Sequence, residues 1–380
     1  MSGLYFHIPY CKQACHYCDF HFSTQLKSKP KLLRAMGQEL DLRSEELKGP
    51  LSSIYFGGGT PSLLSAEEIG DLIALGLQIG DTMQHETSIE ITLEVNPDDV
   101  TLSRLKSWKS AGVNRLSLGV QSFSESDLRF MNRAHNGEQA MSALRWTSEV
   151  FENYSVDLIY GIPEQRGHSW GENLAIIEEF APVHLSCYAL TREPKTAMDH
   201  YMKQGVMPEL DEQQAEREYK ELLTWAEANN YVNYEFSNFA KPGFESVNNT
   251  AYWSGRPYLG IGPSAHSYDG LTRSWNVANN ALYLKSIEQQ ELPITREELT
   301  FVDRYNEYVM TRLRTAKGIN LDEVVRLFDQ KTRDNLLRMA HKPIEQGLLI
   351  IKEGHLLVGE EGKFLTDGIA SALFLVNLGS

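Results

Sequence analysis

The chain has 380 residues, of which 42% are hydrophobic and 23% charged, a composition typical of folded globular proteins. Its 36 Lys and Arg against 51 Asp and Glu give a net charge of −15, which argues against a nucleic-acid partner because such a protein needs a basic face. No apolar run reaches the length of a membrane span, and the N-terminus lacks the pattern of a secretory signal. We therefore expect a cytoplasmic protein without a transmembrane segment, while peripheral membrane contact stays open.

Strand and helix patterns alternate through the first half of the chain. A helical pattern covers residues 29–47, Ser65 and Glu68 form a capping-box pattern, and Thr101 is expected to begin another helix. Strands are predicted over residues 4–8, 52–58, 88–95, 114–120, 155–161 and 183–190. Six such repeats predict a parallel α/β sheet, either open and doubly wound or a complete or partial barrel, and periodicity alone does not choose between these.

The pattern changes after residue 205. A polar helix is expected over 211–230, and residues 231–270 are rich in aromatic side chains, Asn and Gly. From residue 299 two helical segments precede a hairpin pattern, an order that resembles a winged helix; the acidic net charge favours a small packing or lid domain. We divide the chain into a barrel over 1–205, an extension that completes its core over 206–290, and a C-terminal domain over 291–380.

Three of the four cysteines lie within eight residues of one another, directly after the first predicted strand. Cys11, Cys15 and Cys18 can bind three irons of a [4Fe–4S] cluster and leave the fourth iron open for another ligand. The alternative is a zinc site that takes its fourth ligand from His7, His16 or His21, although zinc sites usually pair two short ligand groups and no second group exists here. The fourth cysteine, Cys187, lies in an apolar run and is expected to be buried.

Polar and glycine residues follow several of the other predicted strands. Glycines 57–59, followed by Thr60 and Pro61, come after the second strand. The third strand ends with Glu94 and Asn96, the fourth with Gln121, and the fifth contains Asp157. Because the carboxyl ends of strands in a β/α array form one face, these groups and the cysteine loop are expected to share one site.

The pattern Cys11-x-x-x-Cys15-x-Tyr17-Cys18, followed by GGGTP at 57–61, resembles the radical S-adenosylmethionine superfamily. More narrowly, the chain resembles the group that contains oxygen-independent coproporphyrinogen III oxidases and the related haem chaperones. Further matching segments are residues 93–99, 116–123, 156–163, 188–194 and 257–268. The resemblance implies a partial (β/α)6 barrel with the cluster at its mouth, followed by a C-terminal extension and a small helical, winged-helix-like domain.

The resemblance also implies which residues contact S-adenosylmethionine. Gly58, Gly59 and Thr60 would line its methionine end, Arg133 would pair with its carboxylate, and Glu94 would accept hydrogen bonds from its ribose. The remaining implied contacts are Tyr5, Tyr17, Gln121 and Asp157. From spacing alone, Arg133 could equally be a solvated arginine at the end of a helix.

Two features bear on the choice between the oxidases and the chaperones. The cysteine motif begins at residue 11 without a longer preceding segment, and Phe20 occupies the position where the oxidases carry a further cysteine. Both features resemble the chaperone branch, whose members bind haem and deliver it to acceptor apoproteins. The alternative is a coproporphyrinogen III oxidase or another radical enzyme that acts on a tetrapyrrole, and a third reading is a zinc-stabilised barrel with an interaction role.

One segment departs from the chaperone pattern. Those proteins typically show His-Asn-x-x-Tyr-Trp, whereas this chain has Asn248 at the histidine position, followed by Tyr252 and Trp253 at the ends of the motif. An amide is a poor ligand for haem iron, so axial ligation at residue 248 is in doubt. His266 is a substitute ligand or else a loop histidine that bonds the backbone, and Tyr252 and Trp253 either stack on a porphyrin or pack in the core.

Overall fold

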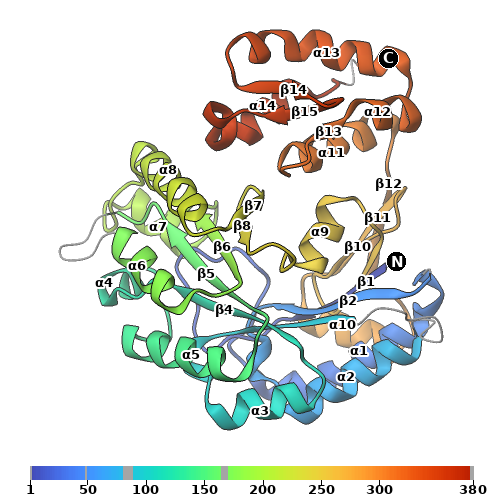
Figure 1. The fold of residues 1–380 in the computed structure, drawn as a ribbon. Helices are drawn as coiled ribbons and strands as arrows, with labels where there is room; N and C mark the ends of the chain where they lie inside the picture. Colours follow the sequence, from blue (N-terminus) through green and yellow to red (C-terminus); the bar gives the residue numbers. More distant parts are fainter. Residues whose placement is uncertain (1, 48, 80–88, 164–169, 377–380) are drawn as a thin grey trace.

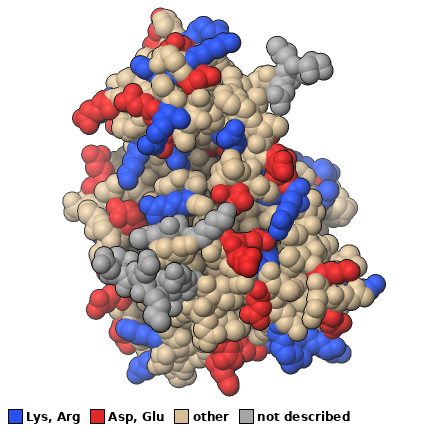
Figure 2. Space-filling model, turned by 90° about the vertical axis from the view of Figure 1, so that its right-hand side faces the viewer, with Lys and Arg blue, Asp and Glu red and all other residues tan. Residues whose placement is uncertain are grey.

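The structure, a computed structural model, describes residues 2–47, 49–79, 89–163 and 170–376. Figure 1 shows one large twisted sheet with a layer of helices around its outer face and a smaller C-terminal domain above it. Within the described residues, no helix is long and apolar enough to cross a bilayer. On the face drawn in Figure 2, acidic and basic side chains are interspersed.

Six parallel strands form the centre of the large sheet, in sequence order from β1 to β6. Their bounds are β1 Ser2–Ile8, β2 Leu51–Gly58, β3 Glu90–Val95, β4 Arg115–Gln121, β5 Tyr154–Tyr160 and β6 His184–Ala189. All six coincide with predicted strands, although residue 88 of the third prediction lies outside the described residues. The local pattern of strand and helix segments was therefore sufficient to locate them.

Further strands extend this sheet at both edges. On one side β9 (Tyr258–Ile261) pairs in parallel with β1 and is followed by the antiparallel strands β10 (His266–Tyr268), β11 (Thr272–Asn276) and β12 (Ile294–Glu298). On the other side β8 (Asn238–Ala240) and β7 (Val232–Glu235) follow β6. Because β12 and β7 are two free ends of the described sheet, it does not close, and the predicted partial barrel is confirmed.

The helices connect the strands and pack beside one another in a single layer, in the order α10, α1, α2, α3, α5, α6 and α8. Their bounds are α1 Lys29–Leu42, α2 Ala66–Ile79, α3 Leu102–Ser110, α4 Glu125–Phe130, α5 Gly137–Val150, α6 Trp170–Phe180, α7 Ala197–Lys203, α8 Glu212–Ala228, α9 Val247–Trp253 and α10 Asn280–Glu288. The predicted caps are present: Thr101 accepts from the amide of Arg104, and Ser65 and Glu68 bond each other's backbone amides.

Alternation along each strand separates two environments. In β1, Leu4, Phe6 and Ile8 are fully buried on the side that faces the helices, where each contributes roughly 1.5–3 kcal/mol through burial of apolar surface. Tyr5 and His7 point to the opposite, concave side of the sheet. The concave side therefore carries the polar and aromatic residues available for a site.

The C-terminal domain has its own hydrophobic core, which begins at Tyr305. Its elements are α11 Phe301–Leu313, β13 Ile319–Asn320, α12 Leu321–Leu327, α13 Gln330–Glu345, β14 Leu349–Lys352, β15 His355–Val358 and α14 Thr366–Ala372. The three strands form a separate sheet in the order β13–β15–β14, which gives the helix, strand and hairpin order of a winged helix. Residues 294–298 belong to the large sheet, so this second core starts later than the proposed boundary at residue 291.

Candidate cofactor site

The cysteine loop follows β1 and is held by backbone contacts to a distant segment. The amide of His16 donates to the carbonyl of Met131, and the amide of Met198 donates to the carbonyl of His16. The side chain of Asn132 donates to the carbonyl of Ala14. These bonds fix the loop at the carboxyl end of the strands, as the β/α pattern predicted.

Burial raises the pKa of two of the three thiols. Burial raises the pKa of Cys11, a shift that a hydrogen bond from Thr60 opposes. Burial likewise raises the pKa of Cys18 to about 11. Thiols in this setting stay protonated at neutral pH unless a cation binds them, so the loop is suited to metal ligation rather than to nucleophilic chemistry.

The donor geometry distinguishes a cluster from a single metal ion. In a [4Fe–4S] cube each thiolate binds its own iron, whereas a zinc site needs all its donors around one point. Among the described residues, no group of three His, Cys, Asp or Glu side chains converges on one ion position. A ring nitrogen of His16 bonds the carbonyl of Phe130, and His7 bonds the carbonyl of His21. The three thiols are thus compatible with a cluster, in which each would bind its own iron.

Arg133 connects the cysteine loop to the strand ends. Its Nη1 donates to Cys15 Sγ and to the Tyr17 hydroxyl, both at 3.3 Å. Its Nη2 donates to Asn96 Oδ1 at 2.9 Å and to the Gly119 carbonyl at 3.0 Å. Nε is buried without a hydrogen-bond partner in the described part of the chain. Arg133 is therefore a half-buried organising residue rather than a solvated helix-end arginine, and only Nε is left for a ligand.

The glycine loop after β2 is shaped by contacts with β1. Gly58 has φ +104°, and a Cβ there would lie 2.6 Å from the His7 ring. A Cβ on Gly59 would lie 2.6 Å from the Tyr10 carbonyl oxygen. The amides of Gly59 and Thr60 donate to the carbonyls of Ile8 and Tyr10. These glycines are required for close packing of the loop, which brings its outer edge to the cavity.

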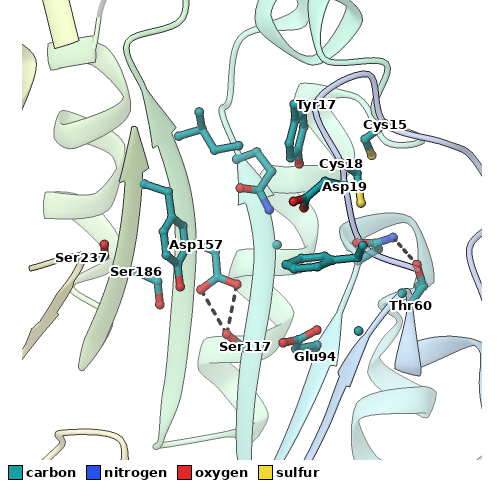
Figure 3. A pocket seen from close by; sticks show the side chains of 18 of the residues that line it. Cys15, Tyr17, Cys18, Asp19, Thr60, Glu94, Ser117, Asp157, Ser186 and Ser237 are labelled. Atoms are coloured by element: carbon teal, nitrogen blue, oxygen red, sulfur yellow. Dashed lines mark hydrogen bonds between the residues drawn. The ribbon is translucent and has the colours of Figure 1, made fainter. Parts of the chain in front are cut away.

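Two half-buried carboxyl groups lie on the concave side of the sheet (Figure 3). Tyr55 donates to Glu94 at 2.8 Å, yet burial is the larger effect and raises the pKa of Glu94 to about 7. Burial also raises the pKa of Asp157, although Ser117 donates to both of its oxygens at 3.1 Å. Both groups are held in place by hydroxyl donors, so they can accept hydrogen bonds from a ligand in fixed directions.

A cavity of about 610 Å³ joins these groups. Its lining includes every predicted site residue except Tyr5: Cys11, Cys15, Tyr17, Cys18, Gly58, Gly59, Thr60, Glu94, Gln121, Arg133 and Asp157. In Figure 3 Cys15 and Cys18 lie at one end of the cavity and Asp157 and Ser186 at the other. Gln121 has φ 66°, a left-handed conformation that is uncommon outside glycine, so the chain turns sharply where this side chain meets the cavity.

Tyr5 lies outside the cavity lining. Its hydroxyl is 3.2 Å from His7 Nδ1, while His7 Nε2 is 3.1 Å from the His21 carbonyl. Burial lowers the pKa of His7 to about 4, so the ring is neutral; Nε2 donates to the carbonyl and Nδ1 accepts from Tyr5. Tyr5 thus holds His7 in place behind the glycine loop rather than completing the pocket as the resemblance implied.

Asn96, one of the predicted strand-end residues, lines the cavity and links Arg133 to Thr60. The cavity lining also contains residues that sequence reasoning did not assign to the site. The side chains of Tyr55, in β2, and Tyr188, in β6, also line the cavity. Arg314 of the C-terminal domain reaches the cavity and pairs with Asp367 at 2.6 Å, which no local pattern could indicate.

Comparison with known proteins identifies the family. The radical SAM superfamily model matches residues 5–175, and the HemN C-terminal domain model matches residues 299–365. The chain is 33% identical over 382 residues to the heme chaperone HemW of Bacillus subtilis, covering 98% of this chain and 99% of that protein. This chain belongs to the HemW family of radical SAM proteins.

Other relatives agree with this membership. HemW of Haemophilus influenzae is 34% identical, covering 84% of each protein. A mitochondrial radical S-adenosyl methionine domain-containing protein from Bos taurus is 30% identical, covering 98% of this chain and 87% of its own length. Coproporphyrinogen III oxidase (HemN) from Escherichia coli has a TM-score of 0.83 at 26% identity, covering 98% of this chain and 89% of that one. The fold of this HemW-family chain is therefore that of HemN.

Membership in the HemW family implies a [4Fe–4S] cluster and S-adenosylmethionine, and the residues present fit both groups. The three thiols offer the donors for a cluster, and Arg133 Nε is a buried donor that no described group satisfies. When bound, the pair would supply one-electron radical chemistry. Glu94 and Asp157, held by hydroxyl donors, would then orient the ligand.

The segment that departs from the chaperone pattern lies on the concave side, away from the cysteines. Asn248 is in the first turn of α9, where the Ser53 hydroxyl donates to its Oδ1 at 3.4 Å. The side chain of Tyr252 is 48% exposed. Trp253 packs at the joint with the C-terminal domain, where the Arg314 guanidinium lies 5.1 Å from its ring and Arg312 donates to its carbonyl. Tyr252 is thus open to a ligand, whereas Trp253 has a packing role.

Proposed function

We propose that this protein is a haem chaperone that holds a [4Fe–4S] cluster on Cys11, Cys15 and Cys18, binds S-adenosylmethionine in the adjoining cavity, and delivers haem to an acceptor apoprotein. One observation carries the proposal. In a chain that matches a haem chaperone over 98% of its length, the three cysteines line a cavity that also carries two carboxyl groups held by hydroxyl donors.

Phe20 supports the choice of a carrier over an oxidase. It occupies the position of the additional cysteine, lines the cavity and is 64% exposed. An aromatic ring there offers no thiol for redox or acid–base chemistry. The concave sheet beyond the cavity carries the exposed Tyr252 and the half-buried rings of Tyr258, Tyr268 and Trp275, an aromatic surface that suits a flat apolar cargo.

Transfer of haem to an acceptor tests the chaperone function. Anaerobically reconstituted protein is loaded with haem and mixed with apomyoglobin as a test acceptor, and the Soret band reports transfer. We expect transfer to require contact, so a dialysis membrane between the two proteins should slow it strongly. Equal rates with and without the membrane would show simple release of haem and contradict the proposal.

The second candidate is oxidation of coproporphyrinogen III, favoured by the structural likeness to HemN of Escherichia coli. An anaerobic assay with reductant, S-adenosylmethionine and coproporphyrinogen III distinguishes the two functions. We expect no protoporphyrinogen from this protein. Turnover comparable to that of a true oxidase run in parallel would reverse the order of the candidates.

A further inference from the structure

Strands β9, β10 and β11 present two unlike faces. On the concave face His266 lies opposite Trp275, and Tyr268 lies opposite Arg273 and beside Tyr258. On the other face the alternate residues Ser267 and Ser274 are buried. Facing residues of antiparallel strands share a side of the sheet, so the concave side forms one continuous surface. We call Tyr252, Tyr258, His266, Tyr268 and Trp275 the aromatic face.

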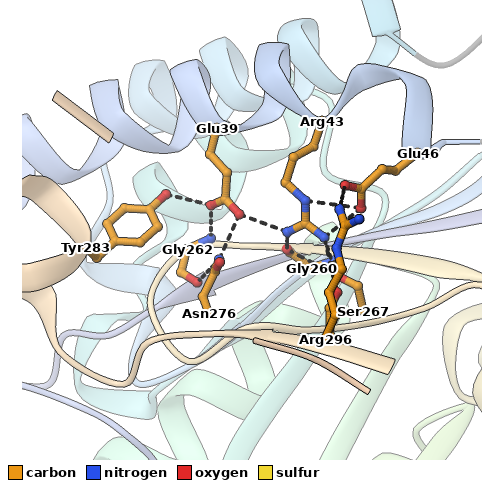
Figure 4. Close-up of polar contacts among 10 residues, drawn as sticks. Glu39, Arg43, Glu46, Gly260, Gly262, Ser267, Asn276, Tyr283 and Arg296 are labelled. Carbon is orange, nitrogen blue, oxygen red and sulfur yellow. Dashed lines mark hydrogen bonds and ion pairs between the residues drawn. The ribbon is translucent and has the colours of Figure 1, made fainter. Parts of the chain in front are cut away.

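A buried polar network fixes these strands from behind (Figure 4). Arg43 of α1 donates to the Gly260 carbonyl and to the Ser267 hydroxyl, both at 3.0 Å. Its partner Glu39, 2.9 Å away and fully buried, accepts from the Gly262 amide at 2.8 Å.

The Glu39 carboxylate also accepts from the side-chain amide of Asn276 at 2.7 Å and from the Tyr283 hydroxyl at 2.6 Å. Glu39 and Arg43 therefore tie α1 and α10 to three strands at once. The aromatic face is held on a rigid support, and a rigid support lowers the entropic cost of binding a ligand.

His266 differs from the histidines around it. The rings of His7, His21 and His16 are each engaged by a hydrogen bond within the protein. Neither ring nitrogen of His266 makes a hydrogen bond within the described ranges, and the side chain is exposed. Its ring lies 6.0 Å from that of Trp275 at an interplanar angle of 26°, which holds the imidazole by stacking and leaves both nitrogens free.

The protonation state of His266 also suits a metal ligand. Burial, with a smaller contribution from the positive charge of Arg273, lowers the pKa of His266 below its usual range. The imidazole is therefore neutral at physiological pH, and a neutral imidazole is the form that binds iron.

The surroundings of His266 match the other parts of a haem molecule. Tyr258 stands between Tyr252 and Tyr268, with ring centroids at 5.9 and 6.5 Å, so aromatic rings continue along the sheet from α9 to β10. Arg273, which forms an ion pair with Glu307, and Arg304 lie near Tyr268, as does the carboxylate of Asp269. The guanidinium groups suit the carboxylates of a tetrapyrrole.

We propose that His266 is the axial ligand of haem iron, with the porphyrin lying against the aromatic face. This inference rests on the proposed haem-carrying function and assigns its binding site. It also accounts for Asn248, which offers only an amide on α9 while the strand beside β9 supplies an imidazole.

Haem titration of the full chain tests this assignment by affinity and by the Soret and EPR spectra. His266→Ala is compared with wild type, with Asn248→Ala and with His200→Ala, an exposed histidine on α7 whose loss controls for removal of a surface imidazole. We expect His266→Ala to lose the spectrum of nitrogen ligation and to bind haem about tenfold or more weakly. Added free imidazole should restore that spectrum, whereas the other two variants should match wild type.

Three results would count against the proposals, each in a different way. If wild type shows no saturable haem binding, the haem-carrying function fails and the ligand assignment fails with it. If wild type binds haem and His266→Ala keeps both the spectrum and the affinity, the assignment is wrong while the function stands. If Asn248→Ala alone loses the spectrum, ligation lies on α9.

Discussion

The cofactor cavity and the aromatic face lie on the same concave side of one sheet but are built in opposite ways. In the cavity the polar groups are half-buried and bonded to one another, as Arg133 is to Cys15, Tyr17 and Asn96. On the aromatic face Tyr252 and His266 are exposed, the other rings are half-buried, and the buried polar groups, Glu39 and Arg43, stand behind the strands.

The difference follows from what each region is proposed to hold. A resident cluster and cofactor need ligands fixed in direction, and burial with many hydrogen bonds provides this. A cargo must enter and leave, so its site needs exposed flat surface on a rigid support. Variants can therefore be chosen that change one region and leave the other intact.

The largest effect is expected from removing the thiols of the cavity. A triple Cys11→Ala, Cys15→Ala and Cys18→Ala variant should contain no cluster, whereas wild type should hold about four irons and four sulfides per chain. Anaerobic iron and sulfide analysis measures this, and Cys187→Ala, a fully buried thiol outside the loop, is the matched control. Stoichiometric zinc without sulfide in wild type would contradict the cluster.

Haem binding by the same triple variant tests whether the aromatic face is independent of the cofactor cavity. Because the aromatic face draws no ligand from the cysteine loop, its haem affinity should remain close to that of wild type. A large parallel loss of haem binding would show that the two regions form one site.

The support behind the aromatic face should be the most sensitive part for stability. Glu39→Gln leaves the Arg43 guanidinium without its fully buried carboxylate partner, and removing one member of a buried pair costs about 3–5 kcal/mol. Denaturant unfolding measures the free-energy change. The control Glu46→Gln removes a partner of Arg43 that is 34% exposed and should cost less than about 1 kcal/mol. Equal losses would mean that burial of the Glu39 pair is not decisive.

The pH dependence of stability should report on Glu94 in the cavity. Its pKa is raised from 4.5 to about 7 on folding, so the folded state holds this proton more tightly than the unfolded state does. Relative to Glu94→Gln, wild type should therefore lose roughly 3 kcal/mol of stability as pH rises from 4.5 to 7. Urea unfolding at several pH values measures this, and a constant difference between the two proteins would contradict the raised pKa.

The smallest change in stability is expected on the aromatic face itself. Tyr252 is 48% exposed, so Tyr252→Leu should shift the free energy of unfolding by no more than about 0.5 kcal/mol. The same substitution should weaken haem binding, because it removes an aromatic ring from the proposed porphyrin surface. A variant that binds haem as wild type does would exclude Tyr252 from that surface.

Residues close in the chain determined much of this protein before the fold was known. The spacing of Cys11, Cys15 and Cys18 indicated a cluster loop, and the local pattern of strand and helix segments located all six central strands. The helix caps at Ser65 and Thr101 were also predicted from the sequence and are present in the structure. These features depend on local geometry, in which neighbouring residues set the periodicity of burial and the bonds of a helix terminus.

Tertiary structure alone decided the contacts between distant segments. The pairing of β9 with β1 and the burial of Arg43 against Ser267, 224 positions later in the chain, create the support of the aromatic face. The approach of Arg314 to the cavity and the engagement of Arg133 by Asn96 likewise depend on how strands and domains pack. Such contacts are selected by register and by the satisfaction of buried polar groups, which no local pattern of residues contains.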